Sequence, residues 1–301
     1  MSGCPEILGL GEPLIELVRL PDPIDGRPAY VQGFGGETST ALIAAARQGG
    51  RAGYVSAVGD DMFGEALRAL WTREGVDHSN VLTTENAPTG VCFIDPDPSG
   101  RRFTYARTGS AASRFHAKDL PEPAIAAAKV LHVSGITLAI SADMRVASLA
   151  AAEIAEKQGT QVSLDLNHRP KLWSEAEARA VILEICPYVD IVFASDDEAK
   201  LLFGDDTPDA IADRFLALGA KIVIAKQGAK GALLAMANER FPIPPAASKA
   251  IDSSGAGDSF AGAFLAWFLE TGDHLISARK AAEVAAATVS GLGAVEPIPR
   301  R

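Results

Sequence analysis

The segment Asp252–Phe260, with the sequence D-S-S-G-A-G-D-S-F, combines two carboxylates, two glycines and the start of an apolar helix. The glycines lack Cβ atoms, so their backbone can approach a ligand closely and adopt conformations closed to other residues. The helix expected to follow presents unpaired N–H groups and the positive end of its dipole, which suits phosphate oxygens. A carboxylate such as Asp258 would have a function there if it took the proton from a hydroxyl that attacks a phosphoryl group. The alternative is that Asp252 or Ser254 only caps the helix, and the glycines only form a tight turn.

The spacing D-S-S-G-A-G-D resembles the signature of the PfkB/ribokinase family of small-molecule kinases. The resemblance implies an ATP-dependent carbohydrate kinase in which Asp258 is the catalytic base and contacts the sugar. The loop backbone would form an anion hole for the phosphoryl oxygens, contributed by Gly255, Ala256 and Gly257, with Gly255 and Gly257 also facing ATP. The sequence contains no Walker A pattern, so the expected phosphate cradle is of this anion-hole type.

Composition argues against several other classes of protein. The net charge of −10 and the absence of a basic run disfavour nucleic acids and anionic membranes as partners. Cys4, Cys92 and Cys186 form no disulfide or zinc pattern, so we expect reduced thiols in a cytoplasmic protein. The first residues suggest no signal peptide, and the longest apolar run, near 262–269, is far short of a membrane span.

Apolar runs typical of strands alternate with Ala-rich helical patterns along most of the chain. This alternation predicts an α/β fold with a doubly wound, mostly parallel sheet flanked by helices. The expected strands are Lys129–Val133, Gln161–Asp165, Asp190–Phe193 and Lys221–Ala225. The expected helices are Ser141–Lys157, Ser174–Ile185, Thr207–Leu218, Ser259–Leu269 and Ala278–Val289.

Two segments interrupt this rhythm, Glu6–Val31 and Thr89–Arg107, which are rich in Pro, Gly and β-formers. We expect them to supply a small strand-built lid, about residues 12–34 and 88–109, on a single ribokinase-like domain covering 1–301. Ligands of open α/β sheets bind beyond the carboxyl ends of the strands, so a lid there would cover the site and exclude water. Exposed lid edges could also pair across a two-fold axis, which favours a homodimer.

The sugar side of the site is predicted from two further segments. Q-G-F-G-G-E-T-S-T resembles the family signature in which two glycines, Gly35 and Gly36, let the sugar pack against bare backbone. The segments R-T-G-S-A-A-S and H-V-S-G-I-T resemble the 2-keto-3-deoxygluconate kinase branch, which implies that Tyr105 and Arg107 touch a sugar acid. Alternate strand positions share one face, so both side chains could face the substrate; an exposed surface arginine is the competing interpretation. Thr40 and Cys92 depart from the family pattern, where an Asn and a lid Tyr are usual.

The segment D-L-N-H-R-P-K-L-W resembles a strand end of the same branch. Asn167 and Arg169 would alternate with Asp165 along the strand and emerge at its carboxyl edge. The resemblance places Asn167 at ATP, and Arg169 would be a second cation for the substrate carboxylate or the transferring phosphoryl group.

The nucleotide and metal sites are predicted from three motifs. K-Q-G-A-K-G resembles a turn that lines the nucleotide pocket, with Lys226, Gln227, Gly228 and Gly231 at ATP. Glu198 stands where the family has the Glu of N-x-x-E, so it is expected to help hold Mg²⁺, in part through water; a solvated acidic helix start is the alternative. The resemblance also places Asp252 near a monovalent-cation loop, which could hold K⁺.

Together these motifs predict a kinase that transfers phosphate from ATP, with Mg²⁺, to the primary hydroxyl of 2-keto-3-deoxygluconate. A kinase of a neutral ketose such as fructose and a silent sugar- or nucleotide-binding homologue are the alternatives.

Overall fold

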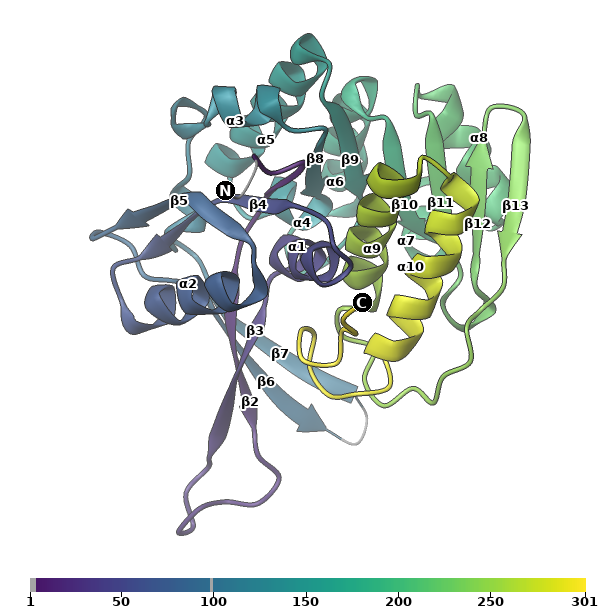
Figure 1. Cartoon of the computed structure of the whole chain (residues 1–301). Coiled ribbons are helices and arrows are strands. Elements are labelled where there is room, and N and C mark those ends of the chain that lie inside the picture. Colours follow the sequence, from purple (N-terminus) through teal and green to yellow (C-terminus); the bar gives the residue numbers. More distant parts are fainter. Residues whose placement is uncertain (1–3, 98–99) are drawn as a thin grey trace.

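The computed structural model describes residues 4–97 and 100–301, which form a nine-stranded sheet covered by helices and a separate four-stranded sheet (Figure 1). The strand order of the large sheet is β13-β12-β11-β10-β9-β8-β1-β4-β5. Seven of these strands are parallel, whereas β12 pairs antiparallel with both β11 and β13. The strands are β1 Ile7–Leu10, β4 Ala52–Gly59, β5 Asp77–Thr84, β8 Val130–Ser134, β9 Gln161–Asp165, β10 Ile191–Ser195, β11 Ile222–Lys226, β12 Ala232–Met236 and β13 Glu239–Ile243.

Helices cover both faces of the large sheet because its central strands are apolar on both sides. Side chains alternate between two buried clusters: in β10, Ile191 and Phe193 join one cluster while Val192 and Ala194 join the other. One face carries α1 Glu37–Arg47, α2 Met62–Glu74, α9 Ala256–Thr271 and α10 His274–Thr288. The other carries α3 Glu122–Ala127, α4 Gly135–Ala139, α5 Ala142–Gln158, α6 Glu175–Ile185, α7 Asp196–Phe203 and α8 Pro208–Ala217.

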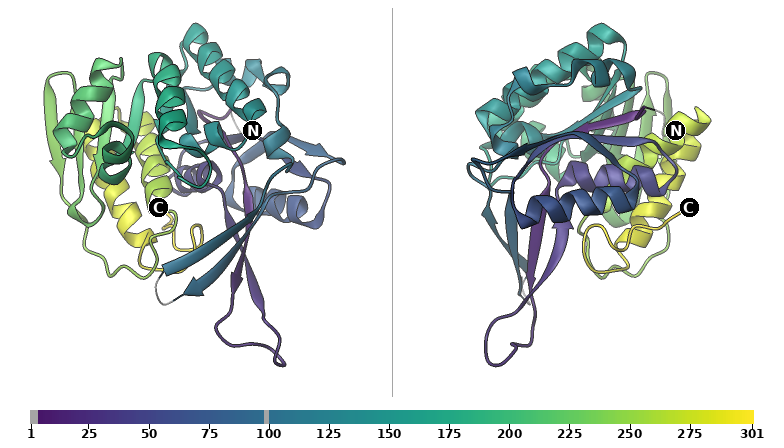
Figure 2. Two further views of the ribbon diagram at one scale, coloured as in Figure 1. Left: turned by 180° about the vertical axis from the view of Figure 1, so that it is seen from behind. Right: turned by 60° about the vertical axis from the view of Figure 1, so that its left-hand side comes forward.

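The small sheet has the order β3-β2-β6-β7 and projects from the body of the molecule, as the views in Figure 2 show. Its strands are β2 Leu14–Arg19, β3 Tyr30–Gly35, β6 Val91–Asp97 and β7 Gly100–Ala106. They come from the two segments expected to form a lid.

The expected fold class is confirmed, and each named strand and helix exists within a few residues of its predicted bounds. The segment Glu6–Val31 was expected to interrupt the α/β rhythm, but its first part, Ile7–Leu10, is β1, a central strand of the large sheet between β4 and β8. These residues lie outside the expected lid of about 12–34. All four residues of β1 are buried, as a parallel strand covered on both faces requires.

Helices α1 and α9 approach closely at Gly262. A Cβ atom there would lie 1.8 Å from the carbonyl oxygen of Ala41, so the two backbones touch with no space for a side chain. This contact fixes how closely the two helices approach each other.

We predict that Gly262→Ala lowers the free energy of unfolding by about 1–3 kcal/mol, because a methyl group must push the helices apart. Gly33→Ala is the control, since its Cβ would meet nothing closer than 3.7 Å. Thermal and urea unfolding of both variants would measure this; equal stability of the two would show that α1 and α9 are not held in this close contact.

Candidate active site

The candidate site lies where the parallel strands end. The carboxyl ends of β8, β9, β10 and β11 bring Ser134, Asp165, Ser195 and Lys226 to one edge of the sheet. The strand order reverses direction between β1 and β8. From β1 the chain adds β4 and β5 on one side, and from β8 it adds β9, β10 and β11 on the other. Ligands of doubly wound folds bind at such a switch point.

The N-termini of α1 and α9 are built differently from those of the other long helices. Side chains of Ser, Thr or Asp cap α2, α5, α6, α8 and α10, whereas α1 and α9 begin at Gly36 and Gly255, and no side chain caps either one within the described chain. Gly255 has φ +73°, and a Cβ atom there would lie 2.5 Å from the carbonyl oxygen of Ala294. Backbone N–H groups without a side-chain cap, at the positive end of a helix, are suited to phosphate.

The interpretation that both glycines need unusual dihedrals was half right. Gly257 lies inside α9 and has no positive φ. What its missing side chain provides is space: a Cβ there would lie 3.2 Å from the Nζ atom of Lys226.

Asp258, in the first turn of α9, is oriented by Asn167. The Nδ2 atom of Asn167 donates to Asp258 Oδ1 at 3.0 Å. Burial of the carboxyl group raises the pKa of Asp258 to about 7, and the carboxylates of Asp165 and Glu37 add to this, while Arg169 and Lys226 oppose it. A carboxyl group with a pKa near neutrality is suited to accept a proton from a hydroxyl.

Lys226 forms a buried ion pair below this carboxylate, with 2.7 Å between its Nζ atom and Asp165 Oδ2. Burial alone would lower the pKa of Lys226, but Asp165, Glu198 and Asp258 favour its charged form and raise the pKa overall. The ammonium group of Lys226 thus holds Asp165 and lies next to Gly257 in the first turn of α9, and its contact with ATP stays a prediction. The turn that follows it, Gly228–Lys230, joins β11 to β12 as expected.

Glu198 uses both carboxylate oxygens to hold backbone. Oε1 accepts from the N–H of His168 at 3.1 Å, and Oε2 accepts from the N–H of Ser195 at 3.1 Å as part of a capping box. Its side chain is only 15% exposed, so the expected alternative of a solvated helix start was wrong, although Glu198 does cap α7. Burial, and repulsion from Asp165, raise the pKa of Glu198.

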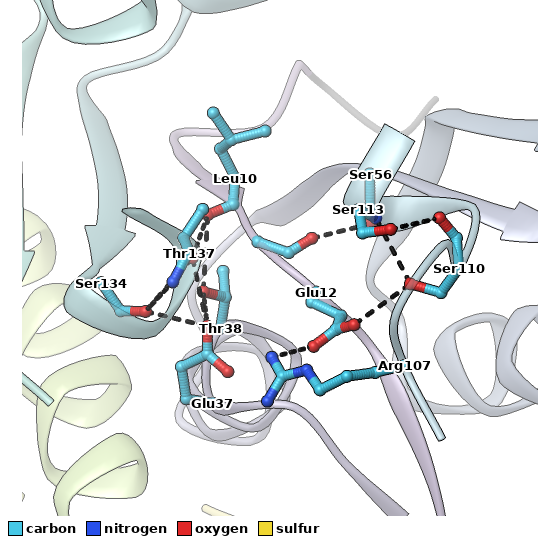
Figure 3. Close-up of polar contacts among 11 residues, drawn as sticks. Leu10, Glu12, Glu37, Thr38, Ser56, Arg107, Ser110, Ser113, Ser134 and Thr137 are labelled. Carbon is cyan, nitrogen blue, oxygen red and sulfur yellow. Dashed lines mark hydrogen bonds and ion pairs between the residues drawn. The ribbon is translucent and has the colours of Figure 1, made fainter. Parts of the chain in front are cut away.

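Arg107 does not present a free guanidinium group, because it forms an ion pair with Glu12, which is fully buried (Figure 3). The alternative of an exposed surface arginine was also wrong, since the Arg107 side chain is 10% exposed. Ser110 donates to the same carboxylate, Oγ to Glu12 Oε1 at 3.3 Å. Burial raises the pKa of Glu12 to about 7, although Arg107 opposes the rise and Glu37 adds to it.

Tyr105 and Arg169 lie close to this pair. The Cζ atom of Arg107 is 5.2 Å from the centre of the Tyr105 ring. Burial raises the pKa of Tyr105, and Arg169 is near enough to act against that rise. Arg169 also weakly pairs with Glu198, at 3.8 Å between Nη1 and Oε1, and its side chain is half exposed. Of the residues predicted to bind substrate, Tyr105 and Arg107 are therefore in contact, and Arg169 is near enough to influence Tyr105 electrostatically.

The strand expected to carry Asn167 and Arg169 ends earlier, so that expectation was wrong. β9 stops at Asp165, and Asn167 has φ +34°, which is not a strand conformation. The chain turns here because the Asp165 carboxylate accepts from the N–H of Asn167 at 3.2 Å. Alternation along a strand therefore does not place these side chains; the turn does.

Of the glycine pair before α1, Gly36 is required by a close contact with the backbone of the protein. Gly36 has φ +95°, and a Cβ atom there would lie 2.3 Å from the carbonyl oxygen of Glu12. Gly35 ends β3 and is buried. The close approach at Gly36 is thus to protein backbone, and contact of either glycine with a sugar stays a prediction.

The two departures from the family pattern are both buried. Thr40 lies within α1, and its Oγ1 atom has no hydrogen-bond partner within residues 4–97 and 100–301. Cys92 is in β6, directly opposite Tyr105 of β7.

Asp252 orders the loop before α9. Its Oδ1 atom accepts from the N–H of Ser254 at 2.9 Å, and Oδ2 accepts from the N–H of Gly293 at 2.8 Å. It therefore does not cap α9, and a role in binding a monovalent cation stays a prediction.

Glu12 and Glu37 are the site residues that the motifs missed. Glu37 Oε1 accepts hydroxyl hydrogen bonds from Ser134 at 2.8 Å and Thr137 at 3.1 Å, as Figure 3 shows. Each glutamate directly follows a glycine beyond a β-type run, which was the available signal. Glu12 lies outside every motif considered, and Glu37 lies inside Q-G-F-G-G-E-T-S-T, where only its glycines were given a role.

A family model and several known relatives show the family of this chain. The model for pfkB family carbohydrate kinases matches residues 8–301. This chain belongs to the pfkB family of carbohydrate kinases. The predicted family and enzyme class are thereby confirmed.

The kinase is similar to proteins with two different sugar substrates in their names. It is 32% identical to the 2-dehydro-3-deoxygluconokinase of Thermoproteus tenax over 97% of this chain and 91% of the relative. It is also 32% identical to fructokinase-1 of Oryza sativa subsp. japonica, over 99% of this chain and 96% of the relative. A structure from Escherichia coli described as a ribokinase II, in complex with ATP and Mg²⁺, superposes with a TM-score of 0.89 at 28% identity, covering 98% of this chain and 96% of that one.

Within the part of the kinase that the structure describes, no helix is both long and apolar enough to cross a bilayer.

We predict that Asp258→Asn stabilises the kinase, and more so at pH 8 than at pH 5. A carboxyl group whose pKa is raised on folding, here from 3.8 to about 7, costs stability as pH rises through that interval. Asn removes this cost, which is on the order of 2 kcal/mol at pH 8 for a partly accessible residue, and it keeps an acceptor for Asn167. Melting temperatures at the two pH values would measure the difference. A stabilisation that does not change with pH would mean that the carboxyl group is not perturbed.

Proposed function

We propose that this kinase transfers the γ-phosphoryl group of ATP to the primary hydroxyl of 2-keto-3-deoxygluconate, also called 2-dehydro-3-deoxygluconate. The observation that carries the proposal is Asp258, a carboxyl group with a pKa of about 7 in the first turn of a helix that no side chain caps within the described chain. A base and an anion site are therefore adjacent.

The reaction follows from that arrangement. Asp258 accepts the hydroxyl proton as the sugar oxygen attacks the γ-phosphorus, and the bond to the bridging oxygen of ADP breaks. Asn167 occupies Oδ1 of the carboxylate, so Oδ2 faces the substrate in this proposal. N–H groups at the start of α9, at Gly255, Ala256 and Gly257, stabilise the charge on the phosphoryl oxygens.

Mg²⁺ fits this site as an ion held mainly by phosphate oxygens and water. No group of three His, Cys, Asp or Glu residues suited to a metal occurs among residues 4–97 and 100–301. Mg²⁺ typically uses one or two carboxylates with retained waters and substrate phosphates. Glu198 would be the carboxylate, and the ion would neutralise charge on the phosphates.

Recognition of a sugar acid rests on Tyr105, Arg107 and Arg169. Their mutual closeness gives a cationic surface between the small sheet and Asp258. Because the pKa of Glu12 is about 7, the Glu12–Arg107 pair keeps part of its positive charge near neutral pH, and that charge could pair with a carboxylate.

A neutral ketose such as fructose is the second candidate, and the same pair favours it. When Glu12 is ionised, Arg107 already has a carboxylate partner inside the protein. Glu37 adds another acidic group near Asp258. Both would repel a substrate carboxylate.

The small sheet is proposed as the lid of this site, on one domain spanning 1–301. The chain enters the small sheet at Glu12 and leaves it at Arg107, and Arg107 contacts Tyr105, so these connections lie at the proposed substrate site. The small sheet exposes apolar surface at Tyr30, Val31 and Phe93, which a second copy of the kinase could cover to form a homodimer. The cytoplasm remains the proposed location of the kinase.

We predict that Asp258→Asn lowers kcat by roughly 10²–10⁴-fold with ATP binding retained, because Asn cannot accept the hydroxyl proton. ADP release and nucleotide affinity, measured on the same preparation, would test this. Wild-type turnover in the variant would exclude Asp258 as the base.

We predict that Arg107→Gln lowers kcat/KM for 2-keto-3-deoxygluconate by roughly 10–150-fold, the effect of losing a charge-assisted contact to a carboxylate. The loss with fructose should be less than about threefold.

The control for that prediction is Glu12→Gln/Arg107→Gln, which leaves no buried carboxylate without its partner. The double variant should show the same substrate split if Arg107 binds the sugar acid. Equal losses with both sugars would mean that Arg107 only holds the small sheet, and the neutral ketose would become the better assignment.

A further inference from the structure

We propose that Asn167 is a positioning residue for the phosphoryl transfer: its amide fixes which oxygen of Asp258 takes the proton. This inference rests on the proposed function of Asp258 as base. It replaces the expectation that Asn167 serves ATP.

The contact between the two side chains has one chemically sensible direction. A carboxylate only accepts hydrogen bonds, so the Asn167 Nδ2 atom, 3.0 Å from Asp258 Oδ1, must be the donor. Asn167 is 5% exposed, so water competes little for the amide. With Oδ1 occupied and its rotation restrained, Oδ2 is the oxygen left for a hydroxyl.

The backbone of Asn167 is held at φ +34°, a conformation that glycine adopts more easily. Three successive N–H groups are pinned there. Leu166 donates to the carbonyl of Phe193 at 2.9 Å, Asn167 to Asp165 Oδ1 at 3.2 Å, and His168 to Glu198 Oε1 at 3.1 Å.

Two further contacts fix this turn from outside. A Cβ atom on Gly135, the first residue of α4, would lie 1.9 Å from the carbonyl oxygen of Leu166, so the helix packs directly on the turn. Lys226 in turn fixes the Asp165 carboxylate at 2.7 Å. A turn determined by so many contacts aims the Asn167 side chain in one direction.

A glycine at this position would give the same backbone without strain. An asparagine, which adopts a positive φ more readily than most residues, is present instead, and unlike glycine it donates a hydrogen bond to the proposed base. The amide also stabilises the ionised carboxylate. Neighbouring charges act on the ionisation of Asp258 in both directions. The carboxylates of Asp165 and Glu37 oppose it, whereas the cations Arg169 and Lys226 favour it.

The test is Asn167→Gly, which keeps the positive φ and removes only the amide. We expect a melting temperature equal to or above that of the wild type, with kcat reduced by roughly 10–100-fold and the KM for ATP changed less than about threefold. We also expect the acidic limb of the kcat/KM profile to move up by about one pH unit, because the charged base loses a hydrogen bond. Asn167→Ala should show the same kinetics, with lower stability because of its φ.

Two controls keep this test specific. Asn86→Gly removes an exposed amide outside the site and should leave kcat unchanged. Asn167→Gly/Asp258→Asn should be no slower than Asp258→Asn alone, because the amide has no base left to orient.

Three results would contradict the inference. They are a normal kcat in Asn167→Gly, a tenfold higher KM for ATP with normal kcat, and additive losses in the double variant; the second would return Asn167 to the nucleotide. A fully active Asp258→Asn would instead refute the proposed function itself, so the two failures can be told apart.

Discussion

The buried charge of Lys226 is the constraint on which the rest of the site depends. Asp165, Glu198 and Asp258 each favour the charged ammonium group, and Asp165 contacts it directly. Without that cation, three carboxyl groups could not lie together at this edge of the sheet except by taking up protons. The ion pair therefore does more for the arrangement of Asp258 than for stability, since a buried pair repays little of its desolvation cost.

Glu12 has a comparable position between the two sheets. It lies where the chain passes from β1 to β2, pairs with Arg107 just after β7, and its carbonyl touches Gly36 at the end of β3. Ser110 completes the contacts around the carboxylate. Glu12 thus contacts several of the segments that connect the large and small sheets. Its ionisation also determines how much positive charge the Glu12–Arg107 pair has for a ligand. In the proposed function, substrate recognition and the attachment of the small sheet therefore depend on the same contact.

The fold, and the position of Asp258 at the start of α9, could be predicted from the sequence because both are local signals. Periodic apolar runs gave the strands and helices, and D-S-S-G-A-G-D marked the start of α9. β1 was not among the named strands, since a four-residue strand flanked by Gly and Pro carries little periodicity. The pairs Glu12–Arg107 and Lys226–Asp165 join residues 95 and 61 positions apart (107 − 12 and 226 − 165), and no spacing in one sequence encodes such pairing. Asn167 was expected to continue the strand because the alternating pattern Asp165, Asn167, Arg169 does not reveal that the Asp165 carboxylate turns the chain.

The central claim is that this carbohydrate kinase moves phosphate from ATP onto a primary sugar hydroxyl next to Asp258. The direct test is a ³¹P and ¹³C NMR analysis of the products formed from ATP, Mg²⁺ and a panel of keto sugars and their acids. We expect one ADP for each sugar phosphate, with the new ester on the primary carbon of 2-keto-3-deoxygluconate or, in the second case, of a neutral ketose. An ester on an anomeric or secondary oxygen, or ADP formed with inorganic phosphate alone for every sugar, would contradict the claim.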